Sequence, residues 1–307
     1  MENFETSISG KIIENKEGMP KEMSIITHRG LNLEKENYFT ESSREAFADQ
    51  IARGFGLEFD LQFTKDGKMV VLHDFDLKRL TSGKNTRKIS EINATELLEM
   101  DFSGCHLVSF GELLRMITTA PNNRSVNALH IKSAWQENKY LDEILKELEL
   151  VDTEKFIVID LKVEPARYLK GKNPRLHLAP SLSHPYDIER FNTAVGGTLL
   201  PIEEVIKNRD LYDWVWLDEW DRKDRDGKTK ILNDRHTFET LKQHGFKIAL
   251  VTPEMHKSSP GLLAADSHSH EDATTEETLR KRLKEILSLG PDAVCSDRPD
   301  LIKGLVK

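Results

Sequence analysis

Two carboxylates stand two residues apart in an apolar stretch of the chain. The stretch GLEFDLQF covers 56–63 and places Glu58 and Asp60 between large apolar residues. Residues two apart in a β-strand point to the same face, so both carboxylates are expected to project together. Such a pair is costly to bury unless a cation or a proton lies between the two groups. A divalent metal accounts for the pair. The alternative is that one side chain reaches solvent or pairs with an arginine.

Two histidines and an arginine follow other strand-like runs. His28 and Arg29 end the run SIITHRG, and His73 ends the run KMVVLHD. If these ends meet at one rim, they add two imidazoles and a guanidinium to the carboxylate pair. Phosphodiester cleavage needs that combination: one group to accept a proton, one to donate a proton, and positive charge for the phosphoryl oxygens. A satisfied structural histidine is the alternative for each imidazole taken alone.

The elements that must position these residues alternate along the chain. Short apolar runs are separated by segments with apolar residues at three- and four-residue intervals, such as NKYLDEILKELELV and EETLRKRLKEILSLG. This repeat predicts an α/β protein with a (β/α)8 TIM barrel. A doubly wound open sheet is the alternative, disfavoured because no glycine-rich loop follows the first run. The eight predicted strands are 24–30, 56–64, 127–133, 155–162, 175–182, 214–219, 247–253 and 293–299.

One connection is longer than a barrel turn requires. It joins the second and third predicted strands, and only its last part, VSFGELLRMITTA, has the period of an outer helix. We therefore predict a small insertion at 65–107 within a single domain covering 1–307. The polar loops 221–230 and 256–277 follow strand ends and are candidate lids, or simply mobile loops.

Composition narrows the class of protein. The chain has 307 residues, 38% of them hydrophobic, and a net charge of −8. These values predict a soluble globular protein without a nucleic-acid surface. The absence of long apolar runs and of a signal-peptide pattern predicts no stable membrane insertion and a cytoplasmic location. Cys105 and Cys295 form no CxxC pattern, so no disulfide framework or thiolate metal site is expected. Residues 1–22 either close the bottom of the barrel or form a tail.

Several motifs together resemble the glycerophosphodiester phosphodiesterase family. ITHRG, TESSREAF and GLEFDLQFTKDGKMVVLHDFDLKRLTSG follow the family pattern of HRG, PENTxxAF, ExD, TxDG and VVxHDxxLxRxT. The stretch DAVCSDRPDLI resembles the family's final strand. The resemblance implies a TIM-barrel hydrolase of lipid metabolism that converts a glycerophosphodiester to sn-glycerol 3-phosphate and an alcohol, with Mg²⁺ or Ca²⁺ as cofactor.

The resemblance also assigns roles to individual positions. His28 and His73 correspond to the catalytic acid and base, and Glu58 and Asp60 correspond to metal ligands. Arg29 and Lys132 correspond to residues that contact the substrate phosphate. The expected partner is a small-molecule or glycoconjugate phosphodiester.

The chain departs from the family pattern on the third predicted strand. HIK stands where the family has ExK, so His130 replaces an acidic residue. Imidazole suits Mn²⁺ or Zn²⁺ better than Mg²⁺ or Ca²⁺. Three interpretations remain. His130 is a ligand and the metal preference shifts; Glu58 and Asp60 hold the metal with water or with another acid such as Asp218; or metal affinity is weakened. We favour a retained metal with His130 near it.

The remaining pocket residues are harder to identify from the sequence. Trp216, Glu254 and His256 are candidate substrate contacts, although the tryptophans near 214–220 are more often packing residues. Two alternative functions stay open: a lyase or phosphotransferase that releases a cyclic phosphate, and a barrel that binds a phosphodiester without turning it over.

Overall fold

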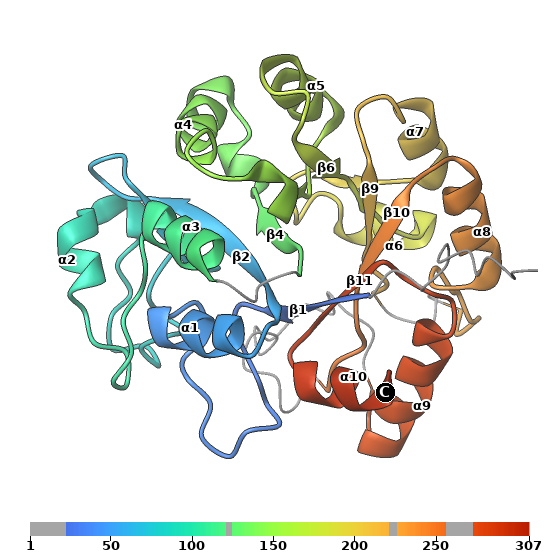
Figure 1. Ribbon diagram of the computed structural model, residues 1–307, viewed down its shortest axis with the longest axis horizontal. Coiled ribbons are helices and arrows are strands. Elements are labelled where there is room, and N and C mark those ends of the chain that lie inside the picture. The colour runs from blue at the N-terminus through green and yellow to red at the C-terminus, as the bar shows by residue number, and fades with distance from the viewer. Residues whose placement is uncertain (1–22, 121–124, 221–225, 256–272, 307) are drawn as a thin grey trace, which may run out of the picture.

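The strands of the protein form one curved sheet with helices around it (Figure 1). The computed structural model describes residues 23–120, 125–220, 226–255 and 273–306. Within this part of the chain the strand order is β6-β5-β4-β2-β1-β11-β10-β9-β7-β8, with β3 paired to β2. The strands are β1 (Ser24–His28), β2 (Gly56–Phe63), β3 (Met69–Val71), β4 (Asn127–His130), β5 (Phe156–Ile159), β6 (His177–Ala179), β7 (Ser181–Leu182), β8 (Leu199–Leu200), β9 (Trp214–Leu217), β10 (Lys247–Val251) and β11 (Ala293–Ser296).

The barrel closes where a proline divides one strand into two. β6 pairs in parallel with β5, and β7 pairs in parallel with β9. Pro180 lies between them and has no N–H to donate, but its carbonyl accepts the Trp216 N–H at 3.0 Å. Residues 177–182 therefore act as one barrel strand joining the two halves of the sheet. The predicted (β/α)8 barrel is confirmed, and each of the eight predicted strands contains a strand of the ring.

Amphipathic helices cover the outside of the ring. Four of them begin after a Ser, Asp or Thr side chain that accepts an N–H of the first turn, namely Ser43, Ser109, Asp234 and Thr275. The helices are α1 (Arg44–Ala52), α2 (Ala94–Leu98), α3 (Phe110–Thr119), α4 (Asn138–Leu148), α5 (Val163–Lys172), α6 (Pro185–Phe191), α7 (Ile202–Lys207), α8 (Arg235–Gln243), α9 (Glu276–Leu287) and α10 (Pro299–Leu305).

Alternation along β2 sends its apolar and polar residues to opposite faces. Leu57, Phe59, Leu61 and Phe63 belong to the apolar core shared with the outer helices. The residues between them, including Glu58 and Asp60, point to the inside of the barrel. The barrel interior holds aliphatic side chains, several of them small, together with two tryptophans: Ile26, Ala128, Ile157, Ile159, Ala179, Trp214, Trp216, Ala249, Val251, Ala293 and Cys295.

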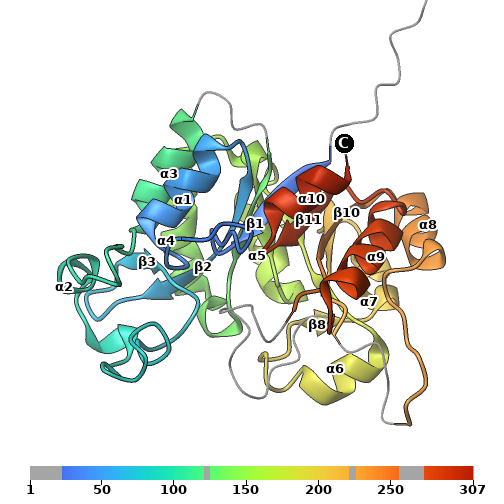
Figure 2. The same cartoon turned by 90° about the horizontal axis from the view of Figure 1, so that it is seen from below.

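The segment between β2 and α3 packs beside the barrel (Figure 2). β3 runs antiparallel to the distal half of β2, with Leu61 opposite Val71. It is followed by η1 (Ile89–Glu91) and by α2. These elements share a separate apolar cluster, formed by Val70, Leu72, Leu77, Ile89, Ile92, Ala94, Leu97, Phe102 and Leu107. That 65–107 is an insertion within a single domain of 1–307 stays a prediction.

Some predicted features lie outside the described residues. They are 1–22, 221–225 and 256–272, which include His256 and parts of both candidate lids. Among the described helices, none combines the length and apolar character that crossing a membrane requires.

Candidate active site

A pocket of about 380 Å³ opens at the carboxyl ends of the barrel strands. This is the end at which the loops of a TIM barrel build active sites. All seven residues singled out from the sequence line it: His28, Arg29, Glu58, Asp60, His73, His130 and Lys132. Their catalytic and ligand roles stay predictions, but the fold places the side chains in one pocket.

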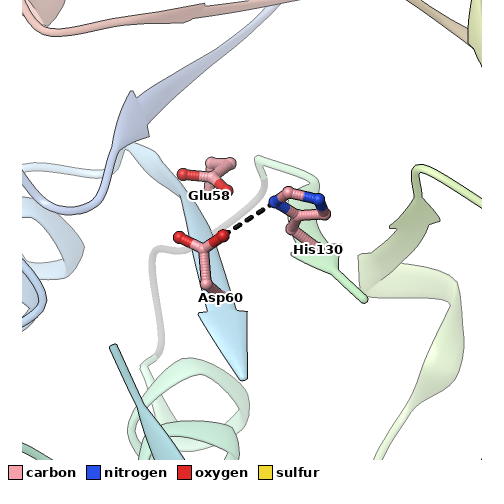
Figure 3. Close-up of side chains that lie close together, drawn as sticks. All are labelled: Glu58, Asp60 and His130. Carbon is pink, nitrogen blue, oxygen red and sulfur yellow. Dashed lines mark ion pairs between the residues drawn. The ribbon is translucent and has the colours of Figure 1, made fainter. Parts of the chain in front are cut away.

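The register of the strands brings three possible ligands together (Figure 3). His28 lies opposite Glu58 across β1 and β2, and Asp60 lies opposite His130 across β2 and β4. Glu58, Asp60 and His130 each offer one ligand atom, and these atoms lie within 4.8 Å of one another. This spacing is compatible with a single divalent cation.

Asp60 is fully buried and surrounded by positive charge. Its Oδ1 lies 2.9 Å from Lys132 Nζ and 2.7 Å from His130 Nδ1, and its Oδ2 lies 3.8 Å from Arg29 Nε. Burial alone would raise the pKa of Asp60, but the charge of Lys132 and the hydrogen bond and charge of His130 outweigh it and hold that pKa well below its usual range. Asp60 is therefore a carboxylate anion.

Glu58 has fewer positive and hydrogen-bonding neighbours than Asp60, the other carboxylate of the pair. Its Oε2 is buried without a hydrogen-bond partner among the described residues, and His28 Nε2 lies 4.0 Å away. Burial, and then the negative charge of Asp60, raise the pKa of Glu58. A bound cation would satisfy this oxygen and offset the repulsion, so the residues present fit a divalent metal.

His130 contacts two carboxylates at once. Its Nδ1 faces Asp60, and its Nε2 lies 3.1 Å from Asp160 Oδ2. Burial and the charge of Lys132 act to lower the pKa of His130, but the hydrogen bonds with Asp160 and Asp60 raise it to about 9. His130 thus lies beside the carboxylate pair, and that it lies near a bound metal stays a prediction. Asp160 is a partner of His130 that the sequence pattern did not reveal.

His28 is oriented by a carboxylate from the far end of the chain. Its Nδ1 lies 2.7 Å from Oδ1 of Asp297, which is fully buried. Asp297 is in turn held by Glu254, whose Oε1 accepts the Asp297 N–H at 3.0 Å. Burial, followed by the charge of Asp297, raises the pKa of Glu254 well above its usual range. Glu254, a candidate substrate contact from the sequence, therefore lies behind Asp297 and His28 and is not among the residues lining the pocket.

His73 reaches the pocket because β3 returns along β2. The Leu72 N–H donates to the Asp60 carbonyl at 3.0 Å, which places the next residue beside the carboxylate pair. His73 Nδ1 lies 2.7 Å from Asp74 Oδ1, leaving Nε2 as the nitrogen suited to proton transfer. Desolvation, followed by the charges of Arg29 and Lys132, lowers the pKa of His73 and favours its neutral form.

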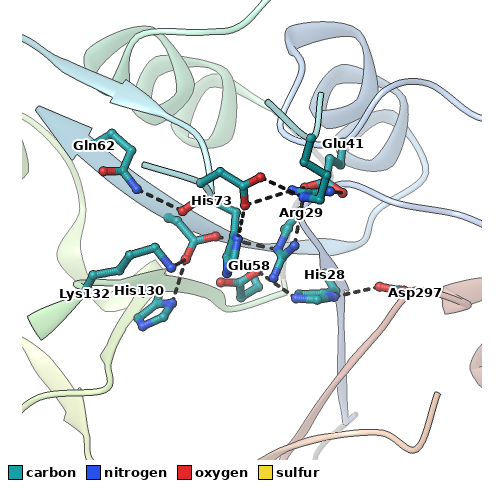
Figure 4. Close-up of polar contacts among 12 residues, drawn as sticks. His28, Arg29, Glu41, Glu58, Gln62, His73, His130, Lys132 and Asp297 are labelled. Carbon is teal, nitrogen blue, oxygen red and sulfur yellow. Dashed lines mark hydrogen bonds and ion pairs between the residues drawn. The ribbon is translucent and has the colours of Figure 1, made fainter. Parts of the chain in front are cut away.

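A network of charges ties the two histidine-bearing loops together (Figure 4). Arg79 donates to Asp74 and to both carboxylate oxygens of Glu41, which also accepts from Arg29 at 3.4 Å. Arg29 itself has φ 53°, a conformation that few side chains adopt, so the network holds a strained strand end in place. Glu41, Asp74 and Arg79 all lie in the motif stretches, yet their spacing does not show that they pair.

The opposite wall of the pocket is largely apolar. Leu199, Trp216, Trp220 and Val251 line it, together with Asp218. Trp220 stacks on Phe191 with ring centroids 4.1 Å apart. Trp214 packs inside the barrel as expected, whereas Trp216 and Trp220 face the pocket. Asp218, one of the acids considered for the metal, lines the pocket but does not belong to the cluster of Glu58, Asp60 and His130.

Comparison with known sequences decides the family. The sequence model of the glycerophosphoryl diester phosphodiesterase family matches residues 28–190. The chain belongs to this family of phosphodiesterases. The match contains all seven candidate residues and ends before β8, β9 and β10, which form much of the apolar wall.

The individual proteins that resemble this chain are distant or match only a short part of it. The uncharacterized protein YqiK of Bacillus subtilis is 44% identical over 61 residues, a stretch that spans 20% of this chain and 24% of YqiK. A glycerophosphodiester phosphodiesterase of Thermotoga maritima has a similar structure, with a TM-score of 0.59, 20% identity, and coverage of 92% of this chain and 98% of that one.

A second solved structure was determined with a bound product. It is a phosphodiesterase of Oleispira antarctica in complex with sn-glycerol-3-phosphate, with a TM-score of 0.61, 15% identity, and coverage of 92% of this chain and 96% of that one. At these identities both structures show the shared fold alone.

Proposed function

We propose that the protein hydrolyses a glycerophosphodiester to a glycerol phosphate and an alcohol, with His28 and His73 as acid and base. The observation that carries the proposal is that each histidine is bonded at Nδ1 to a carboxylate, Asp297 or Asp74, while both rings line the pocket of the carboxylate pair. This arrangement orients Nε2 of both rings for proton transfer. Family membership and the product-bound relative support a glycerol phosphate as the product.

The two histidines divide the proton transfers. One takes the proton of the attacking hydroxyl or water, and the other gives a proton to the oxygen of the departing alcohol. Each carboxylate partner stabilises the ring while it carries the extra proton. Neither Asp297 nor Asp74 needs to change its own protonation for this to occur.

Arg29 and Lys132 hold the phosphoryl group. Both line the pocket beside the carboxylate pair, where a guanidinium and an amine can contact the phosphoryl oxygens. Glu58, Asp60 and His130 would hold a divalent cation, which supplies further positive charge to the phosphoryl oxygens when it is bound. Mg²⁺, Ca²⁺ and, because of the imidazole, Mn²⁺ or Zn²⁺ are the candidates.

The proposal is tested by ³¹P NMR on the purified protein. A panel of glycerophosphodiesters is incubated after chelation and then with Mg²⁺, Ca²⁺ or Mn²⁺ restored. We expect a phosphomonoester resonance that appears only with a cation. A cyclic phosphate that persists would instead indicate a lyase or phosphotransferase. If no combination of substrate and cation gave a new resonance, hydrolysis of this substrate class would be contradicted.

A further inference from the structure

Asp160 is the residue of the pocket whose position is least explained by the roles assigned so far. It follows β5 directly, and its carboxylate lies 3.1 Å from His130 Nε2. His130 occupies the strand position beside Asp60, so the imidazole stands between two carboxylates. A carboxylate at Asp60 and another at Asp160 therefore face the two nitrogens of one ring.

The backbone of Asp160 is held in an uncommon conformation. Its φ is 65°, in the left-handed region that Asp and Asn tolerate better than most residues. Buried Gln136 fixes this turn: its Nε2 donates to the carbonyls of Asp160 and Ile131, each at 2.7 Å. Its Oε1 accepts the Lys162 N–H at 3.1 Å. Local strain of this kind persists only where the surroundings enforce it, and it occurs often at functional sites.

We propose that Asp160 is a positioning residue that fixes the tautomer of His130 for binding a cation. In the structure both ring nitrogens of His130 face carboxylates, Nδ1 facing Asp60 and Nε2 facing Asp160. With a cation bound, Nδ1 would release its proton to solvent and offer its lone pair beside Glu58 and Asp60, while Nε2–H would still donate to Asp160. The inference rests on the cation of the proposed function. A metal-binding histidine commonly donates its other N–H to a carboxylate, which orients the ring and makes the ligating nitrogen more basic. The nitrogen ligand then favours Mn²⁺ over Ca²⁺.

A purely structural role is the competing explanation. The pair of His130 and Asp160 joins the ends of β4 and β5, so it could stabilise the barrel without influencing a cation. In that case the loss of Asp160 lowers stability and leaves metal affinity unchanged. The two explanations are separated by measuring metal binding and thermal stability on the same variants.

The experiment is a Mn²⁺ titration followed by the EPR signal of free Mn²⁺, at one fixed pH. Asp160→Asn removes the charge and keeps a side chain that tolerates positive φ. Asp160→Gly removes the side chain without a backbone penalty. Asp152→Asn is the matched control, because Asp152 is exposed at the opposite end of β5 and Asn is an equally good helix cap there.

We expect Asp160→Gly to weaken Mn²⁺ binding by about 10–100-fold, as loss of such partners does elsewhere. Asp160→Asn should weaken it less, and Asp152→Asn should leave it unchanged. Ca²⁺ competition should show that the preference for Mn²⁺ falls in the Asp160 variants. Unaltered affinities alongside a lower Tm would overturn the proposal in favour of the structural role.

His130→Glu provides the sharpest comparison. With a carboxylate at that position there is no imidazole N–H for Asp160 to accept, so Asp160→Gly should weaken Mn²⁺ binding much less in this background than in the wild type. A loss of affinity of the same size in both backgrounds would show that Asp160 does not act through His130.

Wild-type protein that hydrolyses substrate without binding Mn²⁺ would overturn this inference and leave hydrolysis standing. Protein that binds Mn²⁺ but turns over no substrate would overturn the proposed function, while the affinities still decide the role of Asp160.

Discussion

The two walls of the pocket differ in chemistry and in how closely they follow the family. The polar wall comes from β1, β2, β4 and the segment after β3, all within the residues that match the family. Much of the apolar wall, including Leu199, Trp216 and Trp220, comes from residues beyond that match. If the proposed function holds, we expect the polar wall to carry out the reaction and the apolar wall to select the alcohol.

The largest expected effect is on the polar wall. His28→Ala or His73→Ala should lower kcat by about 10²–10⁴-fold, because each variant removes one proton transfer. The far-UV circular dichroism should be unchanged. His106→Ala is the control, since His106 lies outside the pocket and pairs loosely with Glu45 at 3.7 Å. Wild-type kcat in both pocket variants would remove the histidines from catalysis.

A smaller and more selective effect is expected on the apolar wall. Trp220→Leu removes the ring that stacks on Phe191 and enlarges the pocket. We expect kcat/KM to fall by about tenfold for substrates whose alcohol fills the pocket and to change little for the smallest alcohols. Steady-state kinetics on a series of leaving alcohols measures this. An equal loss for every alcohol would show that the two walls do not have separate tasks.

The smallest effect concerns the stability of the polar wall. Burial would raise the pKa of Glu41, but Arg29 and Arg79 outweigh it, so the pKa is lowered in the folded protein. A lowered carboxyl pKa stabilises the fold at neutral pH, and this contribution is lost as the pH falls below the ordinary value of about 4.3. Glu41→Gln should therefore lower the free energy of unfolding by about 1–3 kcal/mol near neutral pH.

Urea unfolding at several pH values checks this expectation. The difference between Glu41→Gln and wild type should shrink in acid, where Glu41 itself becomes protonated. Glu112→Gln is the control, because Glu112 makes an exposed ion pair with Arg44 at 2.7 Å and such pairs contribute little. A difference that stays constant with pH would mean that the charge of Glu41 does not stabilise the network.

The sequence predicted the barrel because its strands are separate apolar runs with helical segments between them. It did not predict the division of residues 177–182, because that depends on Pro180 lying where the ring closes. The short elements α6 and β8 also escaped prediction, since a few residues carry too little periodicity to identify an element.

For the site, the sequence predicted the side chains that line the pocket better than the residues that hydrogen-bond to them and orient them. Alternation along one strand and motif spacing were enough to select Glu58, Asp60 and His73. The residues that orient them could not be found this way, because Asp297 is separated from His28 by most of the chain. The position of Asp160 depends on a turn in which its φ is positive, and no local sequence pattern predicted that turn. Trp216 was a candidate substrate contact and Trp220 was expected to pack, and the three-dimensional course of the chain places both on the pocket.

The most direct test of the central claim is hydrolysis of a glycerophosphodiester in ¹⁸O-labelled water, followed by ³¹P NMR. Each bond cleaved by water at phosphorus places one labelled oxygen on the phosphate and shifts its resonance slightly. The account predicts glycerol phosphate carrying one ¹⁸O and an unlabelled alcohol. A labelled alcohol, or a cyclic phosphate without label as the final product, would contradict it.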